Sequence, residues 1–293
     1  MNCYFNLPDF LVNTATYELI RKWQKQYPEI FYPNTDIACI YGCPNNVIWN
    51  GGGLVLGNMI FKPQLRDMVA YYNEELNLPL RLTFTNPLIT EQYQLYDTYA
   101  NVVTEAFHNG KNEILVNSPL LEEYLRKNYP NFKYCRSILA AEHIYYDADN
   151  YYLTVLKRDM NNNWEFLDSI PKEARSKIEI LCTDTCPAWC NRLYTHYKDF
   201  AKGQLTFDTD APNINCSCED ARGVFDIYKA TQTNSKYVTR ELIDTQYLPR
   251  GYCQFKLAGR TSVSVAIVNV LQYMILPEYR LDVAGNLIAL YTG

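Results

Sequence analysis

Short β-like runs alternate with helix-like stretches along nearly the whole chain, and this alternation limits the fold more than any other feature. Such alternation is typical of parallel sheets built from βα units. The expected strands are residues 36–41, 80–85, 113–116, 133–139, 151–156, 178–182 and 252–257. The expected helices are residues 16–26, 65–76, 91–108, 120–128, 164–169, 239–247 and 262–274, the last being the final long helix. Seven or eight such units predict an α/β fold with a TIM-like (β/α) barrel, and a doubly wound open sheet is the alternative.

Chain length and composition fit one large domain. With 293 residues, 48% of them hydrophobic, the chain can bury a sizeable core. Because no linker interrupts the alternation, we expect a single (β/α)-barrel domain over residues 1–293. Residues 203–235 are rich in Asp, Asn, Thr and Cys and are too long for a plain connection. We expect them to form an irregular functional excursion over the barrel mouth.

Charge and apolar patterning restrict the partners. A net charge of -5 argues against wrapping nucleic acid by bulk electrostatics, so a nucleic-acid partner is not favoured. It would require a basic groove around Lys198, Lys202 and Arg222. The first residues lack the basic and apolar regions of a signal peptide, and no window approaches the roughly 18 apolar residues of a membrane span. We therefore expect a cytoplasmic protein with no membrane association and leave its oligomeric state open.

The cysteines carry the strongest chemical signal. Ten cysteines in a cytoplasmic protein argue against disulfides and favour metal ligation for some of them. After the strand expected at 178–182, thiols recur every four residues, a spacing that brings sulfurs to one side of a turn and suits a soft metal or an iron–sulfur cluster. The candidate metal ligands are Cys186, Cys190, Cys216 and Cys218, and Cys43, Cys182 and Cys253 are further candidates for the fourth ligand. Zinc is the alternative metal, although a zinc knuckle usually has two residues between paired cysteines.

Polar side chains follow the expected strands, at positions that share one face in a barrel. The carboxyl ends of barrel strands are where catalytic groups collect. We therefore assign substrate binding to Asn86, Asn117 and Asp159, with helix capping as the alternative role of the two asparagines.

Three cationic or titratable side chains are the candidate catalytic residues. Lys256 and Arg260 flank Gly259, a spacing that lets an ammonium and a planar guanidinium approach a carboxylate or phosphate. A salt bridge to the barrel rim is the alternative. His196 follows the cysteine-rich turn and could move protons. The glycine triplet at 51–53 permits close backbone approach to a ligand or simply forms a flexible turn.

Three segments carry a resemblance to a known family. They are residues 113–119 (EILVNSP), 179–190 (EILCTDTCPAWC) and 255–260 (FKLAGR). In their order and spacing they resemble the collagenase-like peptidase superfamily of unknown catalytic type, and the similarity spans nearly all of the chain. Members of that family with known roles include hydroxylases of transfer and ribosomal RNA and oxygen-independent hydroxylases of the ubiquinone pathway.

The resemblance implies a barrel-like fold and a four-iron (4Fe-4S) cluster held by cysteines. Cys186 and Cys190 match the closely spaced pair of the family, and Cys216 or Cys218 matches a later cysteine. Cys43 is similar to an early cysteine of some members. Cys182 departs from the pattern, because that strand position is usually apolar in the family.

These observations predict an iron–sulfur-dependent barrel enzyme, with oxygen-independent hydroxylation or a related redox step on a small-molecule, peptide or RNA substrate. A peptidase is one alternative, but neither a Ser-His-Asp signature nor a His-Glu-x-x-His motif is visible. A non-catalytic zinc or iron–sulfur interaction protein is the other, and it would have a saturated four-cysteine site and no open pocket at the strand ends.

Overall fold

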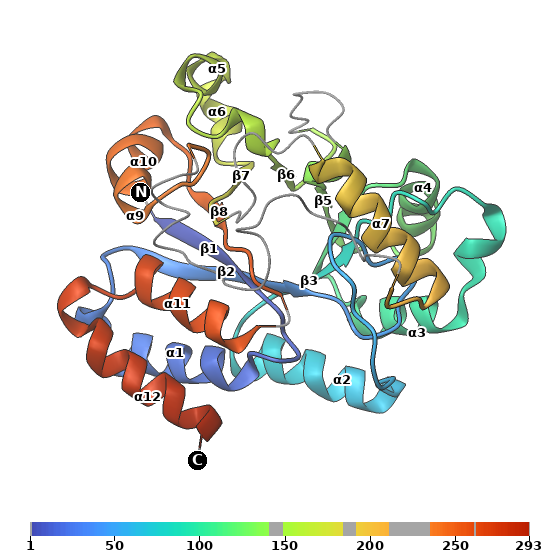
Figure 1. Ribbon diagram of the computed structural model, residues 1–293, viewed down its shortest axis with the longest axis horizontal. Helices are drawn as coiled ribbons and strands as arrows, with labels where there is room; N and C mark the ends of the chain where they lie inside the picture. The colour runs from blue at the N-terminus through green and yellow to red at the C-terminus, as the bar shows by residue number, and fades with distance from the viewer. Residues whose placement is uncertain (1, 141–148, 184–191, 211–234, 261, 293) are drawn as a thin grey trace.

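A closed barrel of eight parallel strands forms the centre of the computed structural model, which describes residues 2–140, 149–183, 192–210, 235–260 and 262–292 (Figure 1). Each strand pairs in parallel with the next, and β8 pairs with β1 to close the ring. The strands are β1 Cys3–Pro8, β2 Thr35–Gly42, β3 Leu80–Phe84, β4 Glu113–Val116, β5 Lys133–Arg136, β6 Leu153–Val155, β7 Ile178–Leu181 and β8 Gln254–Lys256. The predicted TIM-like α/β barrel is confirmed, and closure excludes the doubly wound open sheet.

The strand β1 was not expected from the sequence. Its six residues, CYFNLP, include Asn6 and Pro8 and give no clear alternation of polar and apolar positions. The tertiary structure explains this pattern, because β1 pairs with strands on both sides and its residues from Phe5 onward are all buried. Elsewhere the expected strands are present, and the strands at 133–139, 151–156 and 252–257 are shorter than predicted.

Helices surround the barrel. They are α1 Thr14–Gln26, α2 Lys62–Ala70, α3 Thr98–Phe107, α4 Pro119–Asn128, α5 Trp164–Ser169, α6 Lys172–Arg175, α7 Leu193–Thr206, α9 Arg240–Leu242, α10 Leu248–Arg250, α11 Val263–Tyr273 and α12 Arg280–Thr292. The π-helical turns η2 Tyr71–Glu75 and η7 Ile243–Tyr247 continue α2 and α9, and η1 Pro28–Ile30, η3 Gln92–Tyr96, η4 Ile138–Ala140, η5 Arg158–Met160 and η8 Pro277–Tyr279 are 3₁₀ turns. The expected cap of α4 is confirmed, because Ser118 Oγ accepts a hydrogen bond from the Leu121 N–H at 3.2 Å.

Two helix predictions need correction. The helix expected at 91–108 is interrupted at Asp97, whose carboxylate caps α3 by accepting from the Ala100 N–H at 2.7 Å. The helix expected at 262–274 is not the last one, because α12 follows it. Figure 1 shows α12 beside α1 and α11, and the hydroxyls of Thr16 and Tyr291 lie 2.8 Å apart.

Alternate residues of each strand face the two sides of the barrel wall. On β3, the side chains of Leu80, Leu82 and Phe84 are fully buried in the hydrophobic core between the strands and the helices. Arg81 and Thr83 have the opposite parity and face the barrel interior. The strands are therefore buried on both faces, and their inner faces can hold polar groups only if these groups find partners.

A buried ion cluster lies in the barrel interior around Arg81, the second residue of β3. The Arg81 guanidinium donates to Glu113 on β4 (Nε to Oε2, 2.6 Å), to Glu179 on β7, and to Asn6 Oδ1 on β1 (3.3 Å). These partners come from opposite sides of the ring, so Arg81 spans the interior. Buried charges are tolerated when they are paired in this way. The interior of this barrel is accordingly ionic at this level, where branched aliphatic side chains are usual.

The excursion predicted for residues 203–235 is described only at its ends. Its first residues belong to α7, which extends to Thr206, and residues 211–234 lie outside the described residues. Among the helices that the structure describes, none is long and apolar enough to cross a membrane.

Candidate functional site

A cavity of about 380 Å³ opens at the carboxyl ends of the strands. This mouth cavity is lined by residues of the barrel interior and of the loops that follow the strands: Tyr41, Gly51, Gly52, Gly53, Leu54, Val55, Thr83, Thr85, Leu115, Ser137, Ile138, Leu139, Val155, Leu181, Tyr197, Phe200, Lys256, Ala258, Gly259 and Arg260. Two of these lining side chains are charged, and both are cations. The carboxyl end of the strands is also where barrel enzymes place their active sites.

Lys256 is the last residue of β8 and lies at the floor of the mouth cavity. Its ammonium Nζ sits 4.1 Å from the centre of the Tyr41 ring, a cation–π contact. Burial lowers the pKa of Lys256 from its usual 10.5 to about 8, and Arg81 and Arg260 act in the same direction while the Glu179 charge opposes them. Lys256 therefore carries an ammonium that loses its proton more easily than an exposed lysine does.

Tyr41 holds its position through its hydroxyl, which donates to the Leu257 carbonyl oxygen at 2.5 Å. Burial raises the pKa of this phenol well above its usual value, although the Arg260 charge acts in the opposite direction. Tyr41 is therefore a neutral side chain that presents the face of its ring to Lys256.

Arg260 joins the loop after β8 to the glycine triplet. It donates to Asn50 Oδ1 and Thr83 Oγ1, both at 3.0 Å, and to the Gly51 carbonyl oxygen at 2.8 Å. A Cβ at Gly51 would lie 2.5 Å from the backbone of Thr85, so only glycine fits there. The triplet lets the chain approach the Arg260 guanidinium and the strand β3 closely.

The helix α7 is fixed to the loops around the cavity by two amides. Gln204 donates to the carbonyl oxygens of Val47 and Val55, both at 3.1 Å, and accepts from the Val55 N–H at 2.8 Å. Asn86 is fully buried and donates to the carbonyl oxygens of Ile48 (2.8 Å) and Ala201 (3.1 Å). Figure 1 shows α7 next to the loop that follows β2. Asn86 therefore joins α7 to this loop, and it is not among the residues lining the cavity.

His196 lies on α7, one residue before Tyr197, which lines the mouth cavity. Its imidazole stacks on the ring of Phe200, with ring centres 5.1 Å apart. Burial lowers the pKa of His196, and the Asp199 charge opposes this effect. The predicted catalytic residue His196 is not among the residues lining the cavity, and it contacts one of them, Phe200.

The two remaining predicted substrate-binding residues lie outside the mouth cavity. Asn117 follows β4 and donates to the Thr85 carbonyl oxygen at 3.4 Å. Asp159 lies in η5 after β6, and its carboxylate is 3.9 Å from both the Lys157 ammonium and the Arg158 guanidinium. Both occupy the carboxyl side of the barrel, as expected, but neither contributes to the lining.

The four predicted metal ligands, Cys186, Cys190, Cys216 and Cys218, lie outside the described residues. The three further candidates are buried thiols. Cys182 has the outward parity of Ile180 and packs in the hydrophobic core, and Cys43 belongs to the same core. Cys253 precedes β8 and therefore lies at the amino end of the barrel. Within the segments that the structure describes, no group of three or more Cys, His, Asp or Glu side chains is arranged to hold a metal ion.

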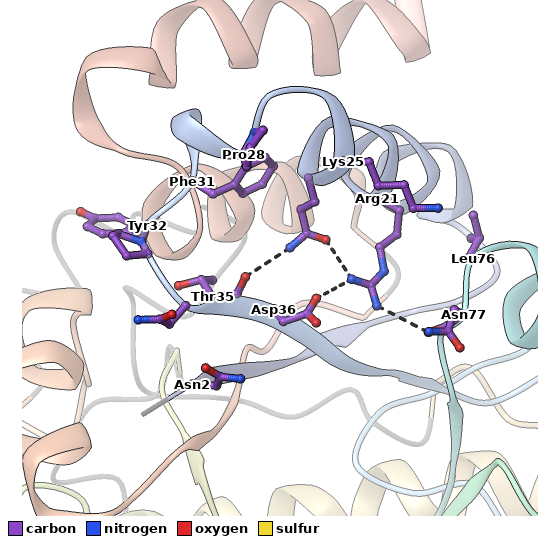
Figure 2. A pocket seen from close by; sticks show the side chains of 13 residues that line it. Asn2, Arg21, Lys25, Pro28, Phe31, Tyr32, Thr35, Asp36, Leu76 and Asn77 are labelled. Carbon is purple, nitrogen blue, oxygen red and sulfur yellow. Dashed lines mark hydrogen bonds and ion pairs between the residues drawn. The ribbon is translucent and has the colours of Figure 1, made fainter.

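A second cavity, of about 690 Å³, lies at the amino end of the barrel. Figure 2 shows Arg21 of α1 and Asp36 of β2 in the lining of this cavity, where the two side chains form an ion pair. The amide of Gln24 bridges to this pair and to the Thr35 carbonyl oxygen. The amino end of a barrel usually serves stability and not catalysis, and the paired charges here fit that role.

Sequence reasoning identified Lys256 and Arg260 but missed Tyr41, Thr83 and Ser137. Tyr41 on β2 and Thr83 on β3 alternate with outward-facing apolar residues, so strict alternation within each strand could have identified these two as interior residues. Ser137 directly follows the end of β5.

Comparisons with protein-family models, with curated proteins and with solved structures find no match to this chain.

Proposed function

We propose that this protein is a barrel enzyme that binds a small anionic substrate in the mouth cavity. One observation carries the proposal. The charged side chains lining the cavity, in the described part of the chain, are Lys256 and Arg260, and no carboxylate is among the lining residues. A partly desolvated cavity of this kind favours an anion, because a low dielectric strengthens the attraction.

The two cations have different roles in this proposal. Three hydrogen bonds orient Arg260, so its guanidinium contributes a fixed positive charge and holds the glycine triplet in place. Among the described residues, the Lys256 ammonium has no hydrogen bond or ion pair, and its contact is with the Tyr41 ring. Lys256 is therefore the side chain that a carboxylate or phosphate can engage directly.

Size further limits the substrate class. A cavity of about 380 Å³ suits a small metabolite, since pockets for drug-sized ligands are roughly 300–1,000 Å³. Leu115, Val155 and Leu181 provide an apolar side, and Thr85 and Ser137 provide hydroxyls. The substrate that fits this lining is a small organic anion with an apolar part.

Calorimetric titration with small mono- and dicarboxylates and phosphate esters tests this proposal. We expect at least one anion to bind, and Lys256→Gln to weaken that binding by roughly 10- to 100-fold, the loss of one charge-assisted hydrogen bond. Lys22→Gln, on the exposed face of α1, is the matched control and should leave binding unchanged. If no anion binds, or if Lys256→Gln binds as tightly as the wild type, the proposal is wrong.

An iron–sulfur cluster and a redox step on the bound substrate are a further part of the proposal, supported by the family resemblance. The cysteines in question, Cys186, Cys190, Cys216 and Cys218, lie outside the described residues, and the described thiols Cys43 and Cys182 are packed in hydrocarbon. When bound, such a cluster would supply electron transfer or an open iron site.

Anaerobic purification followed by iron analysis and an absorbance scan tests the cofactor separately. We expect a brown protein whose visible absorbance is lost in Cys186→Ala or Cys190→Ala, with Cys135→Ala, a buried thiol of β5, as the control that keeps it. A colourless preparation with stoichiometric zinc would instead favour the structural alternative.

A further inference from the structure

We propose that the Lys256 amine is a nucleophile that forms an imine with the carbonyl group of a small oxo carboxylate in the mouth cavity. This inference rests on the proposed anion-binding function and specifies its substrate class. Four features of the structure support it: the position of the amine, its lack of polar partners, the second cation and the charge balance of the barrel interior.

Lys256 lies where a reacting amine is needed. It ends β8 at the mouth of the barrel and lines a cavity large enough for a small ligand. Its Nζ lies over the Tyr41 ring at 4.1 Å, and among the described residues no hydrogen bond or ion pair holds it. The ammonium of a buried structural lysine usually donates hydrogen bonds to carboxylates or carbonyl oxygens. The Lys256 amine is therefore available to a ligand.

Desolvation and neighbouring cations prepare the amine for attack. Burial, together with the Arg81 and Arg260 charges, brings the pKa of Lys256 down to about 8. At pH 7 such a lysine has roughly 300-fold more free amine than one with the usual value of 10.5. Burial and an adjacent cation are the two known ways of activating a lysine for Schiff-base chemistry.

A protonated imine on Lys256 also preserves the charge balance of the barrel interior. The interior ion cluster contains one guanidinium, Arg81, and two carboxylates, Glu113 and Glu179, so the Lys256 ammonium brings its formal charge to zero. Glu179 Oε1 is fully buried and has no hydrogen-bond partner within the described segments. A protonated imine has the same charge as the ammonium, so the balance with Glu179 is kept after the reaction.

The bond changes balance without any other reactant. The ammonium first loses a proton to water, and the Nζ lone pair then attacks the carbonyl carbon. One of the two protons left on the nitrogen moves to the former carbonyl oxygen, giving a neutral carbinolamine. The nitrogen lone pair next expels this hydroxyl, which takes back the proton released in the first step and leaves as water, so that a protonated imine remains. Ser137 can hydrogen-bond the carbonyl oxygen, because its Oγ accepts from Leu139 N–H at 3.1 Å and its own proton has no acceptor in the part of the chain described.

The oxo carboxylate is favoured over a neutral carbonyl compound by Arg260. Its guanidinium lines the same cavity as Lys256, and its charge contributes to the lowered pKa of this lysine. A molecule that carries a carbonyl group next to a carboxylate can place the carbonyl carbon at Nζ and keep the carboxylate near both Lys256 and the fixed charge of Arg260. Glyoxylate, pyruvate and 2-oxoglutarate are the probes that match this description.

Reductive trapping tests the inference. The full-length protein is incubated with each probe and sodium cyanoborohydride, and the site of labelling is found by peptide mass spectrometry. We expect one reduced adduct on Lys256, lost in Lys256→Arg and suppressed by lactate, which resembles pyruvate but lacks the carbonyl group. Surface lysines such as Lys22 should stay unlabelled under the same conditions.

Calorimetric titration of the wild type with the same probes separates the two ways of failing. If a probe binds but is not trapped on Lys256, the imine is refuted and the anion-binding function stands. If neither these probes nor the other carboxylates and phosphate esters bind, the proposed function fails and the imine fails with it.

Discussion

Replacing Lys256 by methionine should make the protein more stable at pH 7, because the fold holds this ammonium in a place where it is poorly solvated. Its pKa falls from 10.5 to about 8 on folding. At about 1.4 kcal/mol per pKa unit, keeping the proton in the folded state costs about 3 kcal/mol at pH 7. Lys256→Met removes the charge at similar side-chain length, so we expect a gain of that order.

The pH dependence of this gain follows from the direction of the shift. Between pH 8 and pH 10.5 the unfolded chain still holds the proton that the folded chain has lost, so the stability of the wild type rises with pH in this window. Lys256→Met has no such group. The stability difference between the two proteins should therefore be largest at pH 7 and disappear above about pH 10.5.

Urea unfolding followed by circular dichroism at pH 7, 8.5 and 10 measures this difference. Lys22→Met on the exposed face of α1 is the control, and its difference from the wild type should not change with pH. If Lys256→Met is no more stable than the wild type at pH 7, or if the gap stays constant up to pH 10, then Lys256 is not desolvated as the structure indicates.

Three further changes have defined outcomes. Arg81→Met leaves Glu113 and Glu179 buried without the guanidinium that pairs with both, and should lower the free energy of unfolding by about 3–5 kcal/mol in urea titrations. Gly259→Ala should lower the melting temperature, because Gly259 has φ of 119° and its Cβ would lie 2.3 Å from Val265 Cγ1. Gln204→Ala removes four hydrogen bonds between α7 and the loop after β2. It should speed amide hydrogen exchange in α7 and weaken anion binding.

Two matched variants serve as controls for the substitutions at Arg81 and Gly259. Arg66→Met, at an exposed surface arginine, should cost less than about 1 kcal/mol, in contrast to Arg81→Met. Gly110→Ala, where a Cβ meets nothing within 4 Å, isolates the cost of a positive φ from the clash at Gly259. Unchanged exchange in α7 after Gln204→Ala would mean that other contacts hold this helix.

The sequence by itself determined the architecture and the position of the central lysine. The alternation of strand-like and helical segments predicted the barrel, since each βα unit is encoded by local periodicity. The position of Lys256 at a strand end predicted its place at the mouth, because all strands of a parallel barrel end on one side. These features depend on residues close together in the chain.

Only the tertiary structure decided which polar groups meet. Arg81 and Glu179 are 98 positions apart, and Arg260 contacts residues 177 to 210 positions away. Such pairings depend on the register of strands around the closed ring, which no local pattern encodes. For the same reason β1 was missed, since its residues form a strand through pairing on both sides. The acidity of Lys256 likewise arises from burial and from charges that only the folded barrel brings together.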